Sequence, residues 1–570
     1  MKKPGWSGDS SFGARKNNLL FFLPLCGIVY WVSNGYTITY PDRARGASGL
    51  HCACNVAQLR RNCGSMQGKP RTRIIKHKNL KMTMTIKRLR FAMMLVCLTT
   101  TAFAGSAKPN FVILLADDVS ADSIGCYGSP NPHTTPNIDK LARSGIRFEN
   151  MFVTEAMCAP ARAELYTGLM PQRNGTFRNH KASNPNIKSV VHYLNDLGYR
   201  VGLAGKKHIG PENVYAFERI DGICGKATET KPKPDDWAGV QNFIKRDPNQ
   251  PFCIVIGSIH AHSPWTVGET KYWKEEDLVL PANLADTPQT RSAYLHYLAE
   301  VREFDRQVGG AVRVLEENNQ LDNTIIIVLD ENGAGMPGGK WTVFDWGVRS
   351  ACVIKCPDSW KANFETDAIS QYCDIVPTLI DAAGGTPSPD LDGRSLLPLI
   401  KGRTKKHREQ AYFLFNNRVH ETKGNPHFST RAVTDGNYKF IWNLTPENLY
   451  VANITTCDLT GRARDTDFGL IYPSMIDRMK TDKHAEAMVN RLRSRPHYQL
   501  YDLKKDPYEL NNLAENPEYS EKIKKFKADI EQWMKEQGDN GHLDPEGMKV
   551  IKYNEYQFPY PKRGSKRSVK

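Results

Sequence analysis

The sequence predicts an α/β protein built on a large mixed, mostly parallel sheet flanked by helices, with a smaller α+β region at its C-terminal end. Continuous apolar runs at residues 110–116, 252–259 and 323–329 are typical of buried parallel strands. Segments with helical spacing of apolar residues alternate with these runs, at 137–145, 187–197 and 291–318. This alternation favours a sheet with helices packed on its faces.

Glycine and turn residues indicate where the expected helices and strands end. Gly145 and Gly198 close the helices at 137–145 and 187–197, because glycine adopts the left-handed conformation that ends a helix. Asp435-Gly436 indicates a hairpin in the C-terminal part. The remaining expected elements are a helix at 158–168, a strand at 200–204, strands on both sides of the hairpin within 432–442, and a final helix near 520–537.

The charge of the chain lies almost entirely in its first part. The 570 residues are 24% charged and 40% hydrophobic, which allows a full core and two domains. Residues 1–104 hold 17 Lys and Arg against two Asp, whereas the rest holds 60 basic and 59 acidic residues. The formal charge of +16 therefore indicates no phosphate-binding surface on the body, and we expect no nucleic-acid partner.

A secretory signal peptide is predicted at residues 82–104. Lys87-Arg88-Leu89-Arg90 precedes the apolar run 91–99, and Ala102-Phe103-Ala104 offers a cleavage site after Ala104. Because a signal peptide belongs at the start of a protein, residues 1–81 are interpreted as an upstream extension wrongly included in the reading frame. The apolar run 19–32 is short for a membrane span. We expect an exported protein, periplasmic or secreted, with no stable membrane span in the mature chain.

The most distinctive motif is Cys158-Ala159-Pro160-Ala161-Arg162 at the start of the helix expected at 158–168. Arg162 stands four residues after Cys158, so the two side chains lie on the same helix face. A buried structural cysteine beside a chance Pro and Arg is the simpler alternative for this motif alone. Seven further cysteines after Ala104 show no zinc-binding spacing and no definite disulfide pairing.

Carboxylates follow two of the expected strands. Asp117-Asp118 comes directly after the strand at 110–116, and Asp330-Glu331-Asn332-Gly333 follows the strand at 323–329. Adjacent carboxylates repel each other unless a cation lies between them, and oxygen ligands favour a hard divalent ion such as Ca²⁺. A turn that merely closes the strand is the alternative for the Asp pair.

Three further loops carry groups that could bind or protonate an anion. Gly205-Lys206-Lys207-His208-Ile209-Gly210 follows the strand at 200–204. His260 and His262 follow the strand at 252–259, and Lys340 lies in Gly338-Gly339-Lys340-Trp341. Each of these loops could be an ordinary surface feature, so its interpretation depends on whether the other motifs are also present.

Taken in order, these motifs resemble those of the formylglycine-dependent sulfatases, over residues 108 to about 540. The run from Lys206 to Tyr215 is most similar to heparan N-sulfatase (sulfamidase) and its bacterial relatives, although Lys340 stands where that enzyme is expected to have arginine. The resemblance implies an alkaline-phosphatase-like fold. It also implies a catalytic domain at 105–402, a smaller C-terminal domain at 403–560 and a basic tail at 561–570.

The resemblance also implies the chemistry. A maturase would oxidise Cys158 to formylglycine, whose hydrate attacks sulfur and later collapses to release sulfate. Arg162, Lys206 and Lys340 would bind sulfate oxygens, His208 would assist the release of sulfate, and His262 would protonate the leaving group. One divalent cation, expected to be Ca²⁺, would be held by Asp117, Asp118, the side chain at Cys158, Glu331 and Asn332.

Several alternatives stay open at this point. The family pattern has Ser-Asp-Asn-Gly where this chain has Asp330-Glu331-Asn332-Gly333, so either Asp330 or Glu331 could be the ligand; the register favours Glu331. His262 fits the spacing to Pro264 better than His260 does. The expected substrate is a sulfated carbohydrate, as sulfate ester or sulfamate. The alternatives are a phosphatase or phosphodiesterase of the alkaline-phosphatase superfamily and an inactive sugar-binding relative.

Overall fold

The computed structural model describes residues 30–33, 36–39, 108–223, 234–357, 360, 362–416, 428–448, 450, 452–455 and 470–541. The chain divides into two units, residues 1–101 and 102–570. The first contains one antiparallel hairpin, β1 (Tyr30–Ser33) with β2 (Tyr36–Thr39). The signal peptide predicted at 82–104 and the tail at 561–570 lie outside the described residues. Within the described part, no helix combines the length and hydropathy needed to cross a membrane.

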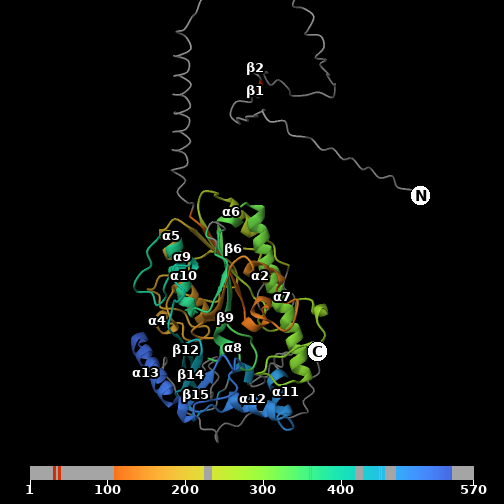
Figure 1. Cartoon of the computed structure of the whole chain (residues 1–570), viewed down its shortest axis with the longest axis vertical. Coiled ribbons are helices and arrows are strands. Elements are labelled where there is room, and N and C mark those ends of the chain that lie inside the picture. The colour runs from red at the N-terminus through yellow and green to blue at the C-terminus, as the bar shows by residue number, and fades with distance from the viewer. Residues whose placement is uncertain are drawn as a thin grey trace, which may run out of the picture. The chain divides into compact units, whose positions relative to one another are not determined.

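A nine-stranded sheet forms the centre of the second unit, as predicted (Figure 1). Its strand order is β10-β4-β9-β8-β3-β7-β5-β6, with β11 paired to β4. β9 runs antiparallel to both of its neighbours, whereas the other pairs are parallel. The strands are β3 (Asn110–Ala116), β4 (Ile146–Phe152), β5 (Arg200–Gly205), β6 (Glu218–Ile220), β7 (Phe252–Gly257), β8 (Thr324–Asp330), β9 (Arg349–Lys355), β10 (Phe364–Thr366) and β11 (Ser370–Gln371).

The apolar runs of the sequence form the middle of this sheet. Every residue of β3, β7 and β8 is buried, because helices cover both faces. Figure 1 shows α5 (Val190–Asp196), α9 (Ile375–Ala382) and α10 (Leu397–Ile400) on one side, and α2 (Pro136–Ala142) with α7 (Pro288–Glu317) on the other. The predicted helices and strands of this region are therefore confirmed, with small shifts at their ends.

Local capping explains where two of these helices begin and end. α7 starts three residues before the predicted Arg291, because Thr287 Oγ1 accepts the Thr290 N–H and Pro288 occupies the first turn. The helix at the cysteine motif, α3 (Cys158–Thr167), ends at Gly168, whose φ of 71° is left-handed. Further short helices are α4 (Pro171–Asn174), α6 (Ala238–Lys245) and α8 (Asp345–Val348).

A separate four-stranded antiparallel sheet follows, in the order β12-β13-β14-β15. Its strands are β12 (Ala411–Asn416), β13 (Ser429–Thr434), β14 (Tyr438–Asn443) and β15 (Tyr498–Asp502), accompanied by α11 (Ile471–Arg478), α12 (Lys483–Arg493) and α13 (Ser520–Gln537). The predicted hairpin at Asp435-Gly436 joins β13 to β14, and the predicted final helix is α13. Phe526 and Ile530 of α13 pack on Phe440 of this sheet. The domain boundary after residue 402 stays a prediction.

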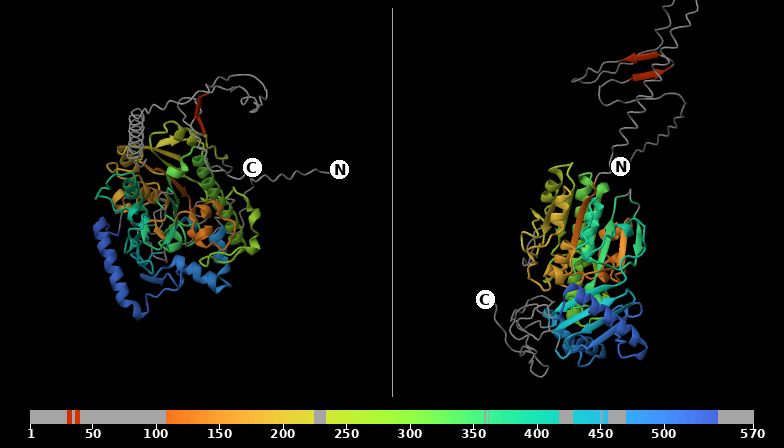
Figure 2. Two further views of the ribbon diagram at one scale, coloured as in Figure 1. Left: turned by 45° about the horizontal axis from the view of Figure 1, so that its top comes forward. Right: turned by 90° about the vertical axis from the view of Figure 1, so that its left-hand side faces the viewer.

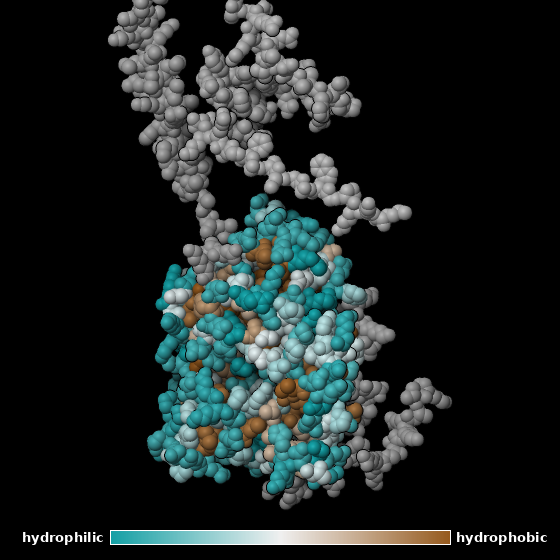
Figure 3. Space-filling view, turned by 45° about the vertical axis from the view of Figure 1, so that its right-hand side comes forward, coloured by the Kyte–Doolittle hydropathy of each residue, from teal (hydrophilic) through white to brown (hydrophobic). Residues whose placement is uncertain are grey.

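The C-terminal elements lie together at one end of the large sheet (Figure 2). Leu414 of β12 donates its backbone N–H to Thr154 O, just after β4, at 3.0 Å. On the face drawn in Figure 3, apolar residues form small separate patches among polar ones. Val279 and Leu470 are the strongly exposed large hydrophobic residues of the described chain, at 52% and 50% exposure. Most apolar side chains are thus used in the interior.

A buried ion pair attaches the end of the described chain to the small sheet. Arg431 of β13 donates from Nε and Nη2 to the two carboxylate oxygens of Asp539, at 2.6 and 2.9 Å, and both side chains are fully buried. Burial raises the pKa of Asp539, but Arg431 outweighs it and holds that pKa below its usual range. Both groups are therefore charged in the folded protein, and each depends on the other.

We predict that Asp539→Ala lowers the free energy of unfolding by about 3–5 kcal/mol, because it leaves the Arg431 charge buried without its partner. Denaturant unfolding followed by circular dichroism measures this loss. Glu521→Ala is the control, since Glu521 pairs with Lys524 on the exposed face of α13 and should change stability by at most about 1 kcal/mol. Equal losses in the two variants would contradict the prediction.

Candidate active site

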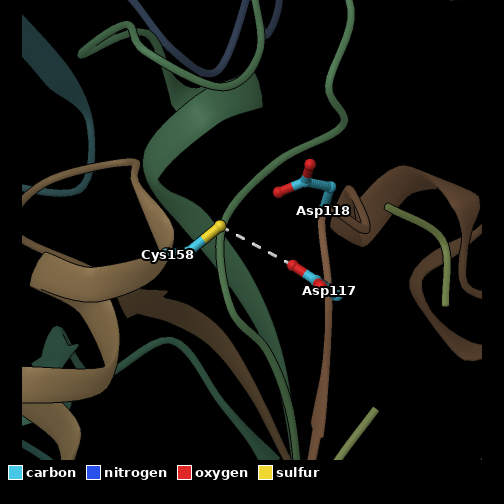
Figure 4. A group of neighbouring side chains, drawn as sticks. All are labelled: Asp117, Asp118 and Cys158. Atoms are coloured by element: carbon cyan, nitrogen blue, oxygen red, sulfur yellow. Dashed lines mark hydrogen bonds between the residues drawn. The ribbon is translucent and has the colours of Figure 1, made fainter. Parts of the chain in front are cut away.

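The candidate site lies at the carboxyl edge of the large sheet. Asp117 and Asp118 follow β3, Glu331 follows the neighbouring β8, and Lys206 follows β5. These strands are parallel, so their carboxyl ends meet at one edge, where ligands bind in open α/β sheets. Figure 4 shows Cys158, at the start of α3, directed toward Asp117 and Asp118 at the end of β3. The structure thus brings together residues that stand up to 222 positions apart in the chain.

Cys158 lies at the centre of this site. Its Sγ is 3.7 Å from Asp117 Oδ1 and 2.9 Å from Lys340 Nζ, and the side chain is buried. Burial raises the pKa of the thiol far above its ordinary value, and Glu331 adds to the rise although Lys206 and Lys340 oppose it. A thiol that stays protonated is a poor nucleophile. The geometry therefore places a cysteine here without activating it as a thiolate.

Three buried carboxylates pair with three cations around Cys158, and we call these six residues the charged cluster. Arg162 and Lys340 are buried, and Lys206 is partly buried. Lys206 Nζ lies 2.8 and 2.6 Å from the two oxygens of Asp117, and Lys340 Nζ lies 2.5 Å from Asp118 Oδ1. Arg162 Nη2 lies 2.7 Å from Glu331 Oε2. With one cation for each carboxylate, the side-chain charges of the cluster sum to zero.

The ion pairs offset the effect of burial on the pKa values of Asp117 and of the three cations. Burial raises the pKa of Asp117, but the opposing effect of Lys206 brings it to about 2. Burial lowers the pKa of Lys206 and of Lys340, and the adjacent carboxylates, Asp117 and Asp118 respectively, more than reverse this. Arg162 behaves likewise beside Glu331. Asp117, Lys206, Lys340 and Arg162 therefore stay charged over the pH range in which proteins normally work.

Two buried oxygens in the cluster region remain without partners among the described residues. They are Glu331 Oε1 and Asn332 Oδ1. An unpaired buried acceptor is costly, and coordination to a cation would satisfy such an oxygen. Ligand atoms of Asp117, Asp118 and Cys158 lie within 4.8 Å of one another, and oxygen donors suit a hard divalent ion. The residues present therefore fit a metal ion.

The two candidate acids at the end of β8, Asp330 and Glu331, face different ways. Glu331 contacts Arg162, as described above, and its Oε2 lies 3.8 Å from Lys206 Nζ. Asp330 instead accepts the Ala351 N–H of β9 at 3.1 Å. Burial raises the pKa of Asp330 well above its ordinary value. The geometry thus favours Glu331 over Asp330 as a ligand.

The histidines of the site differ in their surroundings. His262 Nε2 lies 4.0 Å from Asp118 Oδ2, and the side chain is 31% exposed, so it borders both the cluster and solvent. His260 is buried, with Nδ1 2.6 Å from Glu300 Oε2. His208 Nε2 lies 3.0 Å from His180 Nδ1. Burial, together with Lys206, lowers the pKa of His208 to about 3, so its imidazole is neutral.

Sequence reasoning missed two of these residues, His180 and Glu300. Glu300 accepts the Thr266 and Val267 N–H groups at 3.0 Å as well as bonding His260, so it holds the loop that carries His262. It lies in the middle of α7, where a glutamate is ordinarily a surface residue. His180 lies in an irregular segment outside every motif. Neither residue carries a pattern that a single sequence reveals.

The chain resembles known proteins in sequence. Residues 109–385 match the family model described as Sulfatase, and residues 339–456 match the model described as N-sulphoglucosamine sulphohydrolase, C-terminal. An ulvan-active sulfatase of Formosa agariphila is 32% identical over 444 residues, which cover 76% of this chain and 81% of that protein. Human N-sulphoglucosamine sulphohydrolase is 26% identical over 495 residues, covering 78% and 93%.

Solved structures share the fold. A protein in complex with its substrate D-glucosamine-2-N,6-O-disulfate has a TM-score of 0.59 at 21% identity, covering 77% of this chain and 100% of that one. The phosphonate monoester hydrolase of Agrobacterium radiobacter has a TM-score of 0.56 at 18% identity, covering 75% and 96%. These likenesses confirm the predicted fold class, and the matched sequences go further: the chain belongs to the sulfatase family, whose members hydrolyse sulfate esters or sulfamates.

Proposed function

We propose that this protein removes sulfate groups from sulfated sugars, as sulfate esters or sulfamates, after conversion of Cys158 to formylglycine. The observation that carries the proposal is the charged cluster, with its paired carboxylates and cations, built around the Cys158 side chain. Relatives named for ulvan and for N-sulphoglucosamine support a sugar substrate. The neutral, buried thiol is consistent with a cysteine that is modified before use.

The metal and the modified cysteine supply the reactive chemistry. Sulfatases generally use a metal ion and formylglycine. We propose Ca²⁺ held by Asp117, Asp118 and the side chain at position 158, whose ligand atoms lie together, with Glu331 and Asn332, whose Oε1 and Oδ1 lack partners among the described residues. A bound divalent ion would polarise a sulfate oxygen and add positive charge to the site. Formylglycine would supply, as its hydrate, an oxygen nucleophile in place of the inert thiol.

The remaining residues would bind charge and move protons. Arg162, Lys206 and Lys340 point their donors into the same small region and would hold sulfate oxygens. Because the region is buried, these charges would act in a low dielectric, where they are stronger than in water. His262, at the exposed side, would give a proton to the leaving oxygen or nitrogen, and neutral His208 would accept one during sulfate release.

Cellular context is part of the same proposal. The basic and apolar leader at 82–104 supports export, and the Cys158-Ala159-Pro160-Ala161-Arg162 motif supports recognition by a formylglycine-generating maturase. Both proposals rest on sequence motifs. The leader lies outside the described residues. The substrate would meet the protein in the periplasm or outside the cell.

We predict that Cys158→Ala abolishes turnover of an aryl sulfate while the thermal unfolding midpoint stays close to that of the parent. Mass spectrometry of the peptide containing position 158, from protein made with a maturase, should show the oxidised side chain. Cys126→Ser is the control, because Cys126 lies outside the cluster, and it should keep full turnover. Turnover by Cys158→Ala would contradict the proposal. Unmodified cysteine in protein from its native host would favour an inactive sugar-binding relative.

We predict that Glu331→Gln weakens Ca²⁺ binding at least about tenfold, because Glu331 would be a direct ligand. Mutation of residues that only hydrogen-bond to metal ligands already lowers metal affinity by about tenfold or more. Asp330→Asn should leave Ca²⁺ binding unchanged, since Asp330 faces β9. Isothermal titration of chelator-treated protein with Ca²⁺ measures both. Loss of binding in Asp330→Asn alone would assign the ligand to Asp330 instead.

We predict that the protein hydrolyses aryl sulfates faster than aryl phosphates under the same conditions. The fold alone does not separate these activities, because a phosphonate monoester hydrolase shares it. The donor set separates them: oxygen ligands favour one hard cation, whereas phosphatases of the superfamily generally use two zinc ions held by several histidines. Parallel measurement of kcat/KM decides the matter, and a preference for phosphate would support the phosphatase alternative.

A further inference from the structure

His180 lies outside every sequence motif, yet it contacts His208, the histidine in the loop of Lys206. His180 Nδ1 is 3.0 Å from His208 Nε2, and the two rings lie 4.7 Å apart between centroids. His208 is half-buried, whereas His180 is exposed. The pair thus spans from the edge of the cluster to solvent.

The segment that carries His180 is attached on both sides. The preceding residue, Asn179, accepts the Ala159 N–H through Oδ1 at 3.0 Å, which fixes the segment to the first turn of α3 beside Cys158. On the other side, the Ser183 N–H donates to Gly210 O at 2.8 Å, and Ser183 Oγ lies 2.6 Å from Tyr215 Oη. His180 is therefore held in fixed relation both to Cys158 and to the loop of His208.

The other nitrogen of His208 has a different environment. Nδ1 is buried and has no hydrogen-bond partner among the described residues. Lys206 and Arg162 act on this imidazole as nearby positive charges, and together they outweigh the negative charge of Glu331. A lone pair is more stable than an N–H near such cations. The favoured neutral tautomer therefore carries its hydrogen on Nε2, donates it to His180 Nδ1, and leaves Nδ1 as an acceptor.

We propose that His180 is a positioning residue that holds His208 in the Nε2–H tautomer with Nδ1 turned toward the cluster. This inference rests on the proposed function, in which His208 accepts a proton during sulfate release. His180 does not touch the reacting atoms. It acts by accepting the His208 Nε2–H, in the way that a second group commonly orients a histidine base.

Three substitutions test this role by activity. His180→Asn keeps an acceptor at the δ position and tolerates the left-handed backbone, φ 62°, whereas His180→Ala removes the acceptor. We expect His180→Ala to lower kcat at least about tenfold with KM changed less than about threefold. We expect His180→Asn to restore most of kcat. His180→Ala added to His208→Ala should cause no further loss, because the two residues act as one unit.

A spectroscopic experiment tests the tautomer of His208 without relying on turnover. In full-length protein made without a maturase and labelled with ¹⁵N-histidine, the imidazole nitrogen shifts of His208, assigned with His208→Ala, report its tautomer. We expect the Nε2–H form in the parent and in His180→Asn, and a tautomer mixture in His180→Ala. His133→Ala is the matched control, since His133 is also exposed and left-handed, with φ 69°, and should change neither kcat nor these shifts.

The outcomes are distinguishable. An Nδ1–H tautomer in the parent, or full kcat in His180→Ala, would overturn the positioning role. Equal loss of kcat in His180→Asn and His180→Ala would also overturn it, because an acceptor at the δ position would then not suffice. If the parent with formylglycine does not hydrolyse sulfate at all, the proposed function fails, whereas the tautomer measurement still decides whether His180 orients His208.

Discussion

The constraint on which this structure depends is the burial of three carboxylates and three cations in one small volume. An isolated buried charge costs several kcal/mol or more, so each of these groups is tolerated only with its partner close by. Asp117 with Lys206, Asp118 with Lys340 and Glu331 with Arg162 satisfy this condition at 2.5–2.8 Å. The partners come from separate strand ends, the first helical turns of α3 and a loop. The strand order of the large sheet and the docking of α3 must therefore be correct before any of these charges is stable, and the site and the fold are specified together.

Neutrality of the cluster also explains how one set of residues could serve two ligands. The carboxylates are the natural ligands of a hard cation, and the lysines and arginine are natural partners of sulfate oxygens. In the structure each carboxylate pairs with one of these cations. A divalent cation on the carboxylates would release the ammonium and guanidinium groups to an anion, so binding of the two ligands would be coupled through shared electrostatics.

Much of this could be predicted from the sequence because the decisive residues stand at element ends. Asp117, Glu331 and Lys206 lie within two residues of the ends of predicted strands, and parallel strands bring such positions to one edge. The sequence left Asp330 and Glu331 as alternatives, since only the side-chain direction after β8 separates them. It could not find His180, because the contact with His208 arises from the path of an irregular segment. Hydrogen bonds that involve Asn179 and Ser183 fix that path. Such hydrogen bonds leave no periodic pattern in the sequence.

The small C-terminal sheet contributes to the site through the loop of Lys340. Trp341, the next residue, has a left-handed φ of 65°, a conformation that costs on the order of 1 kcal/mol or more for a bulky side chain. Its N–H donates to Ala156 O at 2.9 Å, and its carbonyl accepts from Tyr450 Oη at 2.7 Å. Lys439 of β14 bonds Asp345 and Val343 O further along the same loop. Because these contacts from the C-terminal part oppose the local strain, Lys340 depends on both sheets for its place beside Cys158. A boundary after residue 402 would thus separate the large sheet from the C-terminal sheet, although residues beyond it hold the loop of Lys340 in place.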